Sequence, residues 1–167
     1  MRFMTIAAVC LPLMAAPRLA AQIPDVTPAA RDSIMQPVHA IFTGMTARDT
    51  AMMRTAFAPG AVLGVIPAPG KSPGFVSVDG FLQSIAAAPA AKVYRERVYD
   101  AEIRLDGGLA TAWMFYTFSV DEKLSHCGVD AFQLMRTSAG WKVIAVADTR
   151  RTAGCAVTSR RLEVPVP

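Results

Sequence analysis

The closing segment of the chain, residues 125–149, reads SHCGVDAFQLMRTSAGWKVIAVADT and decides the fold class. Its two ends, 125–136 and 141–149, are rich in apolar and β-branched residues, and the polar stretch 137–140 between them ends in glycine. Apolar runs joined by a short glycine-containing link are typical of a β-hairpin. We therefore predict two long antiparallel strands joined by a tight turn.

The residues that precede this hairpin extend the same pattern. Segments 93–105 and 109–120 are again rich in β-branched and aromatic residues, and Asp106-Gly107-Gly108 lies between them. An Asp-Gly pair between two such segments is a strong hairpin signal. Residues 121–123 are polar and predict the next turn. The second half of the chain is thus expected to form four consecutive antiparallel strands.

The first half of the chain predicts helices instead. Thr27 is a suitable N-cap residue, and Pro28 suits the first helical turn. Apolar residues then recur at three- and four-residue spacing, which predicts one buried helical face. These residues are Ile34, Val38, Ile41, Phe42 and Met45. Pro37 interrupts this helix and is expected to kink it or to delay its start.

Two shorter helices and a short strand follow. Asp49 can cap the second helix, and either Ser77 or Asp79 can cap the third, while 61–66 is a strand candidate and 67–74 a loop. Helices segregated from a meander of strands indicate an α+β architecture. We predict three N-terminal helices packed against a strongly curved antiparallel sheet, which together form a cone with a pocket at its wide end.

Residues 1–21 are expected to serve export and not the fold. Arg2 begins a short positive start, an apolar run follows over 4–16, and Ala20-Ala21 offers a cleavage site. This order is typical of a secretory signal peptide. A buried N-terminal helix is the alternative, which Pro12 and Pro17 disfavour. The predicted domain then spans 22–155, with a C-terminal tail over 156–167, in a protein exported to the bacterial periplasm or beyond.

Composition excludes several classes of protein. The chain has 167 residues, of which 53% are hydrophobic, and a net charge of +4, which excludes an intrinsically disordered chain. Loss of Arg2 and Arg18 with the leader lowers that charge to +2. A charge this small, without a basic and aromatic stripe, predicts no nucleic-acid partner. We also expect no membrane association once the leader is removed.

Two cysteines remain after the leader is removed, Cys127 and Cys155. In an oxidising compartment an isolated pair predicts a disulfide more often than a metal site. His126 beside Cys127 lacks the spacing of zinc ligands. We therefore predict the Cys127–Cys155 disulfide, no metal and no cofactor.

Alternation along the strands sorts the candidate site residues. His126 and Asp130 share one face of the third long strand. If Arg136 pairs with Trp141, then Asp130 lies opposite Ala147, and His126 lies opposite Arg151. His126 and Asp130 are then candidate catalytic groups, with Arg151 able to hold a ligand oxygen. The alternative is an ion pair at the rim beside a solvated histidine.

Direct contact between His126 and Asp130 is not expected from an unbroken strand. Residues four apart on a strand are separated by about 13 Å. Contact would need a bulge at Gly128 or a bridging ligand, which argues against a tight catalytic dyad. Further ligand-binding candidates are aromatic: Tyr94, Trp113, Tyr116 and Phe132. Tyr116 and Trp113 lie on opposite faces of one strand, so only one of them can line a given cavity, and plain core packing is the alternative for all four.

A family resemblance rests on several of these segments. They are the aromatic strand 113–118, the stretch 125–132, Gly140-Trp141, and the charged residues 148–151 followed by Cys155. Together they resemble the nuclear-transport-factor-2-like superfamily, in particular its exported SnoaL-like and lumazine-binding-like branch. The resemblance implies the cone fold over the mature chain. That superfamily contains isomerases, dehydratases, epoxide hydrolases and non-catalytic binders, so fold alone does not select a function.

The leading functional prediction is an exported protein that binds a small apolar or aromatic molecule in the cone. One alternative is a cofactor-free enzyme, an isomerase, dehydratase or hydrolase, that uses His126 and Asp130. The first helix has no tyrosine, which counts against a site of the ketosteroid-isomerase type. The other alternative is a structural homodimer, because the strands are apolar on both faces.

Overall fold

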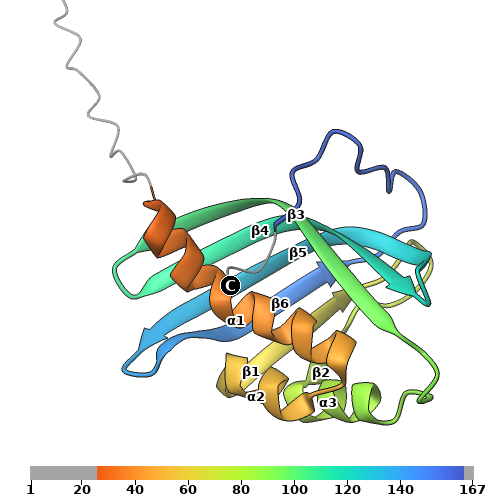
Figure 1. Ribbon diagram of the computed structural model, residues 1–167, viewed down its shortest axis with the longest axis horizontal. Coiled ribbons are helices and arrows are strands. Elements are labelled where there is room, and N and C mark those ends of the chain that lie inside the picture. The colour runs from red at the N-terminus through yellow and green to blue at the C-terminus, as the bar shows by residue number, and fades with distance from the viewer. Residues whose placement is uncertain (1–25, 164–167) are drawn as a thin grey trace, which may run out of the picture.

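The computed structural model describes residues 26–163, so the predicted leader and the last four residues lie outside the described part. Three helices and six strands follow one another along the chain (Figure 1). They are α1 (Pro28–Ala47), α2 (Thr50–Ala56), β1 (Phe57–Ile66), β2 (Gly74–Ser77), α3 (Val78–Ala86), β3 (Tyr94–Asp106), β4 (Leu109–Val120), β5 (Lys123–Thr137) and β6 (Gly140–Thr149). None of the described helices is long and apolar enough to cross a membrane.

The six strands form one curved sheet in the order β2-β1-β6-β5-β4-β3. The three helices cover one face of it, as Figure 1 shows. This arrangement confirms the predicted α+β cone. The sheet is mixed, however, because β1 runs parallel to β6 while the other four pairings are antiparallel. Turn signals predict the relative direction of strands that a hairpin joins. They carry no information about β1 and β6, which are far apart in the sequence.

The helices begin where the capping signals predict. Thr27 accepts a hydrogen bond from the Ala30 N–H, and Asp49 accepts one from Met52. Ser77, and not Asp79, caps α3 by accepting from Gly80. These side chains satisfy amide groups that have no partner within the helix. Helix α1 continues through Pro37, which is buried.

The core lies between α1 and the inner face of the sheet. Ile34 and Val38 of α1 have no exposed surface, and Met114, Leu134 and Val143 from three strands are equally buried. Side chains three and four residues apart on the helix thus pack against alternate side chains of the strands. This core closes the narrow end of the cone.

A β-bulge interrupts the pairing of β5 with β6. Arg136 pairs with Trp141 and Leu134 with Val143, as predicted, but Gln133 then pairs with Ala145, which leaves Ile144 as an extra residue. Beyond this point the predicted register is wrong by one residue. An extra residue moves every later side chain of β6 to the opposite face of the sheet.

The chain beyond β6 crosses the outer face of the sheet and ends beside β3. Cys155 forms the predicted disulfide with Cys127, whose side chain is fully buried. Glu163 then donates its backbone N–H to the Val98 carbonyl, and its carboxylate binds Arg31 at 2.7 Å. The described part of the expected tail, 156–163, is therefore fixed to the domain.

We expect replacement of Cys155 by serine to lower the free energy of unfolding by about 3–4 kcal/mol, because the disulfide limits the freedom of the unfolded chain. The cross-link spans 28 residues. Urea unfolding of the Cys155→Ser variant measures the loss, with Ala153→Ser in the same exposed segment as control. Peptide mapping that found both thiols free in the oxidised protein would contradict the bond.

Candidate functional site

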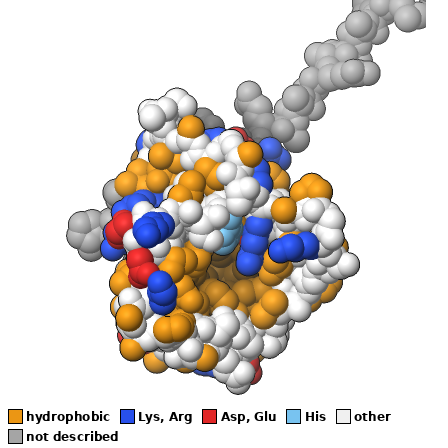
Figure 2. Space-filling view, turned by 90° about the vertical axis from the view of Figure 1, so that its right-hand side faces the viewer, with side chains coloured by type: hydrophobic (Ala, Val, Ile, Leu, Met, Phe, Trp, Pro, Cys, Tyr) orange, Lys and Arg blue, Asp and Glu red, His pale blue; other side chains and the backbone are white. Residues whose placement is uncertain are grey.

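The wide end of the cone holds a cavity of about 740 Å³. Figure 2 looks into its mouth and shows a hydrophobic floor, with histidine and basic side chains at the rim. Most of the wall is apolar and comes from α1, α3 and the strands. Representative lining residues are Ile41, Phe57, Leu63, Phe81, Phe118 and Val146. Such a lining suits a ligand that is itself largely apolar.

One side of the cavity is polar. The groups that face it come from four adjacent strands, β3 to β6, and from the residue directly after β6, and their inward positions follow the two-residue alternation. They are Tyr94, Glu96, Tyr116, His126, Asp130, Asp148 and Arg150. The curvature of the sheet turns these side chains toward one another, so that ionisable groups far apart in the sequence share one apolar enclosure.

Asp130 and Glu96 form a pair of neighbouring acids on this wall. Asp130 is 3% exposed, and its Oδ2 accepts no hydrogen bond from any N–H or hydroxyl of the described residues. Its close polar neighbour is the Glu96 carboxyl. Two carboxyl groups in contact can bond only by keeping a proton between them.

Burial governs the ionisation of both acids. It raises the pKa of Asp130 well above its ordinary value, and the adjacent Glu96 charge raises it further. Burial likewise raises the pKa of Glu96 to about 7, with Asp148 contributing in the same direction. The pair therefore holds a proton near neutral pH, as two close carboxyls do when both cannot ionise.

Asp148, Arg150 and Tyr116 form a second polar group beside this pair. Arg150 holds Asp148 through two hydrogen bonds, of 2.6 and 3.3 Å. The Tyr116 hydroxyl donates to the Thr149 carbonyl at 2.9 Å and lies 3.4 Å from Asp148. Burial, and then the charge of Asp148, raise the pKa of Tyr116, so its hydroxyl remains protonated. The positive charge of Arg150 is thus committed to Asp148.

Gly128 makes the position of Tyr116 possible. A Cβ atom there would lie 1.7 Å from the Thr149 carbonyl oxygen and 2.8 Å from the Tyr116 ring. The missing side chain lets the ring cross β5 and reach β6. The glycine thus permits a contact that links β4, β5 and β6 at the centre of the polar wall.

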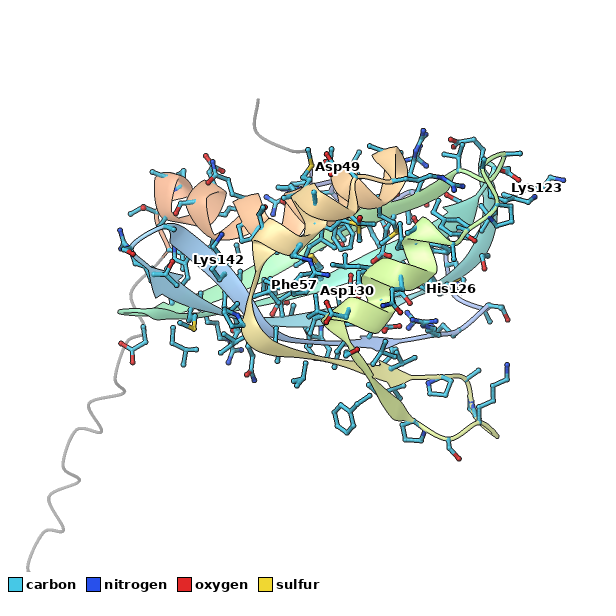
Figure 3. The ribbon with its side chains drawn as sticks, turned by 90° about the horizontal axis from the view of Figure 1, so that it is seen from below. Asp49, Phe57, Lys123, His126, Asp130 and Lys142 are labelled. Atoms are coloured by element: carbon cyan, nitrogen blue, oxygen red, sulfur yellow. A yellow bond between two sulfur atoms is a disulfide. The ribbon has the colours of Figure 1, made fainter. Side chains whose placement is uncertain are left out.

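His126 and Asp130 both line the cavity but do not form a dyad. His126 lies nearer the open end and Asp130 deeper inside (Figure 3). The imidazole packs on Phe118, with ring centroids 4.9 Å apart, and its Nδ1 lies 3.1 Å from the Ser125 hydroxyl. Burial and the nearby Arg150 lower the pKa of His126, so the ring is neutral at pH 7. The strand shows no bulge at Gly128, in agreement with the predicted separation.

Two predicted ligand-binding residues lie on the other face of the sheet. Trp113 is 56% exposed on the outer face. Arg151 also lies there, with its guanidinium 5.4 Å from the Phe115 ring. The bulge at Ile144 explains the error for Arg151, because the shifted register turns Arg150 inward in its place. Tyr94, Tyr116 and Phe132 do line the cavity, and Phe132 also packs edge-on against Phe42.

The sequence prediction misses Glu96 and Arg150. Alternation from Tyr94 places Glu96 inward, so a signal for it existed in the sequence. Arg150 had no such signal, since its direction depends on the bulge. No set of three or more potential metal ligands occurs among residues 26–163.

No protein-family model and no curated protein matches this sequence. Solved structures match its fold. A nuclear-transport-factor-2-like protein with a cystatin-like fold from Novosphingobium aromaticivorans is 13% identical over 74% of this chain and 83% of its own, with a TM-score of 0.60. A nuclear-transport-factor-2-like protein from Cytophaga hutchinsonii is 16% identical over 72% of this chain and 98% of its own, with a TM-score of 0.59.

A third structure, from Streptomyces avermitilis, is named as a candidate dehydratase of the nuclear-transport-factor-2-like family. It is 18% identical over 76% of this chain and 100% of its own, with a TM-score of 0.57. These likenesses confirm the predicted nuclear-transport-factor-2-like fold. The placement in a SnoaL-like or lumazine-binding-like branch stays a prediction.

We expect Glu96→Gln to raise the free energy of unfolding at pH 8 by roughly 1–3 kcal/mol and to leave it nearly unchanged at pH 4. The folded-state pKa of Glu96, about 7, lies above that of the unfolded chain. Protonation therefore stabilises the fold fully below the unfolded pKa, and this contribution is lost as the pH rises through about 7. Glutamine cannot ionise, so the variant does not lose this stability as the pH rises.

Urea unfolding of both proteins at the two pH values measures this effect. Glu102→Gln is the matched control, because Glu102 lies on the same strand but is exposed, and it should show no such pH dependence. Equal stability of the wild type and Glu96→Gln at pH 8 would contradict the raised pKa of Glu96 in the folded protein.

Proposed function

We propose that this protein binds a small, mainly apolar molecule in the cavity of the cone. The observation that carries the proposal is a 740 Å³ cavity with a largely apolar wall and a few convergent polar groups. Ligand sites typically have volumes of about 300–1,000 Å³ and this mixture of lining groups. Phe118 and Tyr94 support an aromatic ligand in particular, since their rings, 5.7 Å apart, line the wall together.

The polar wall supports a ligand with one hydrogen-bonding group at its end. Tyr94 and His126 lie along the wall, and Asp130 lies deeper. An apolar body would fill the space between the sheet and helices α1 and α3, while its polar end reaches the acids. Arg151 has no part in this proposal, because it lies on the outer face.

Acid–base catalysis is the second candidate function, favoured by the two neighbouring acids Glu96 and Asp130. A carboxyl with a pKa near 7 can both give and take a proton at neutral pH. The candidate groups are then Asp130 with Glu96, and His126 is too far along the strand to assist Asp130 directly. Chemistry on the bound molecule separates the two functions: native mass spectrometry recovers an unchanged ligand from a binder and a converted one from an enzyme.

We further propose that the protein is exported. The disulfide of Cys127 with Cys155 supports an oxidising compartment. The predicted leader supplies the route, although it lies outside the described residues. Retention of the ligand should therefore be examined in protein purified from its own periplasm.

We expect Val65→Trp to weaken binding of a neutral apolar fluorophore, N-phenyl-1-naphthylamine, at least about tenfold by occupying the cavity. Val65 lines the cavity from β1 and is only half-buried, so the larger ring has room to enter. Fluorescence titration measures the affinity. The control is Val62→Trp on the same strand, whose side chain lies on the outer face. Loss of binding in the control alone would place the ligand outside the cone.

The homodimer remains a proposal supported by the outer face. Phe75, Trp113 and Val62 are 86%, 56% and 49% exposed and line one groove on this face. We expect sedimentation at micromolar concentration to show a dimer that Trp113→Glu dissociates, because a buried charge without a partner destabilises an interface. Phe81→Glu, on the cavity side, is the control. A monomeric wild type would contradict the dimer.

A further inference from the structure

The charges of the cavity wall do not balance. Three carboxyl groups line it, those of Glu96, Asp130 and Asp148, and Arg150 is the one lysine or arginine among the described lining residues. Arg150 directs both of its side-chain hydrogen bonds to Asp148. Glu96 and Asp130 are left facing an apolar space without a cation.

The basic groups near the mouth do not fill this gap. Arg95 binds Glu122 at 2.6 Å, and Lys92 binds Asp121 at the same distance. These pairs lie on β3, on the loop before it and on the β4–β5 turn, and Figure 2 shows red and blue side chains together at one edge of the mouth. Both of these basic groups thus bind acids at the rim, and neither binds Glu96 or Asp130.

Apart from the proton that the two acids share, the pair also lacks hydrogen-bond donors. Asp130 Oδ2 is buried, and no N–H or hydroxyl of the described residues reaches it. A buried acceptor without a donor costs free energy, and a charged donor such as an ammonium group forms the strongest bonds to it. What is missing from the site is therefore both a positive charge and N–H groups.

On the basis of the proposed apolar site, we propose that the ligand is a small apolar amine, bound as its ammonium with the nitrogen between Glu96 and Asp130. The apolar body then lies against Phe118 and Phe81, and the ammonium donates to the two carboxyls. The other titratable and charged groups that line the same cavity are Tyr94 from β3, Tyr116 from β4, His126 from β5, Asp148 from β6 and Arg150 directly after it. On binding, the proton held between the acids leaves for solvent, and the ammonium takes its place.

Three compounds of one shape test this inference: 4-phenylbutylamine, 4-phenylbutan-1-ol and 4-phenylbutanoate, each displacing N-phenyl-1-naphthylamine at pH 8. We expect the amine to bind at least about tenfold more tightly than the alcohol, because it adds charge-assisted hydrogen bonds. The carboxylate should bind most weakly. Since the amine displaces a proton, its affinity should rise from pH 6 to pH 8 while that of the alcohol stays constant.

Variants test whether the acid pair causes the preference for the amine over the alcohol. Glu96→Gln and Asp130→Asn should each bring the affinities for amine and alcohol close together, and Glu102→Gln, exposed on the same strand as Glu96, should retain the wild-type ratio. Calorimetry in two buffers of different ionisation enthalpy should show proton release with the amine, and none with the alcohol or with Glu96→Gln. The wild-type comparison alone decides the inference if a variant fails to fold.

The outcomes separate this inference from the proposed function. Equal affinity of the wild type for amine and alcohol overturns the amine class and leaves the apolar site standing. Tightest binding of the carboxylate also overturns it, and assigns Arg150 as the anchor for the ligand. Failure of the neutral fluorophore and of all three compounds to bind overturns the proposed function itself.

Discussion

The pairing of β5 with β6 is the constraint on which both the core and the candidate site depend. Up to Leu134 and Val143 the two strands close the narrow end of the cone, where both side chains are fully buried. The extra residue Ile144 then shifts the register, so that Asp130 lies opposite Asp148. A bulge changes the face on which side chains emerge without interrupting the sheet. One strand can therefore be core at one end and polar wall at the other.

The same region is held from both faces of the sheet. On the inner face the absence of a side chain at Gly128 lets Tyr116 reach the Thr149 carbonyl. On the outer face the neighbouring residue Cys127 carries the disulfide, and its backbone exchanges two hydrogen bonds with Arg151. These contacts fix the end of β6 on which Arg150 lies. The polar wall is thus built on a rigid framework, as a ligand site requires if its groups are to be preorganised.

Features set by local sequence could be predicted, and those set by the meeting of distant segments could not. Capping at Thr27, the hairpin at Asp106-Gly107-Gly108 and the burial of Ile34 each depend on neighbours in the chain. Neighbouring residues on a strand point to opposite faces, and the bulge at Ile144 decides that Arg150, and not Arg151, faces the cavity. Nothing in the residue type at position 144 requires a bulge. The parallel pairing of β1 with β6 had no local signal either. The site residues on β4 and β5 were accordingly predicted, whereas the end of β6 was assigned to the wrong face.

The acid pair shows why the polar wall needs an explanation beyond stability. Burying Glu96 beside Asp130 raises the pKa of both groups, so the folded state is penalised whenever the pair ionises. Apolar residues of similar size would remove that penalty, as they do for many buried charges. The surrounding fold tolerates this penalty, because the disulfide and the packing of α1 on the sheet contribute stability of their own. A destabilising group held in place by a rigid scaffold and open to a cavity is the arrangement expected of a site whose partner arrives from outside the chain.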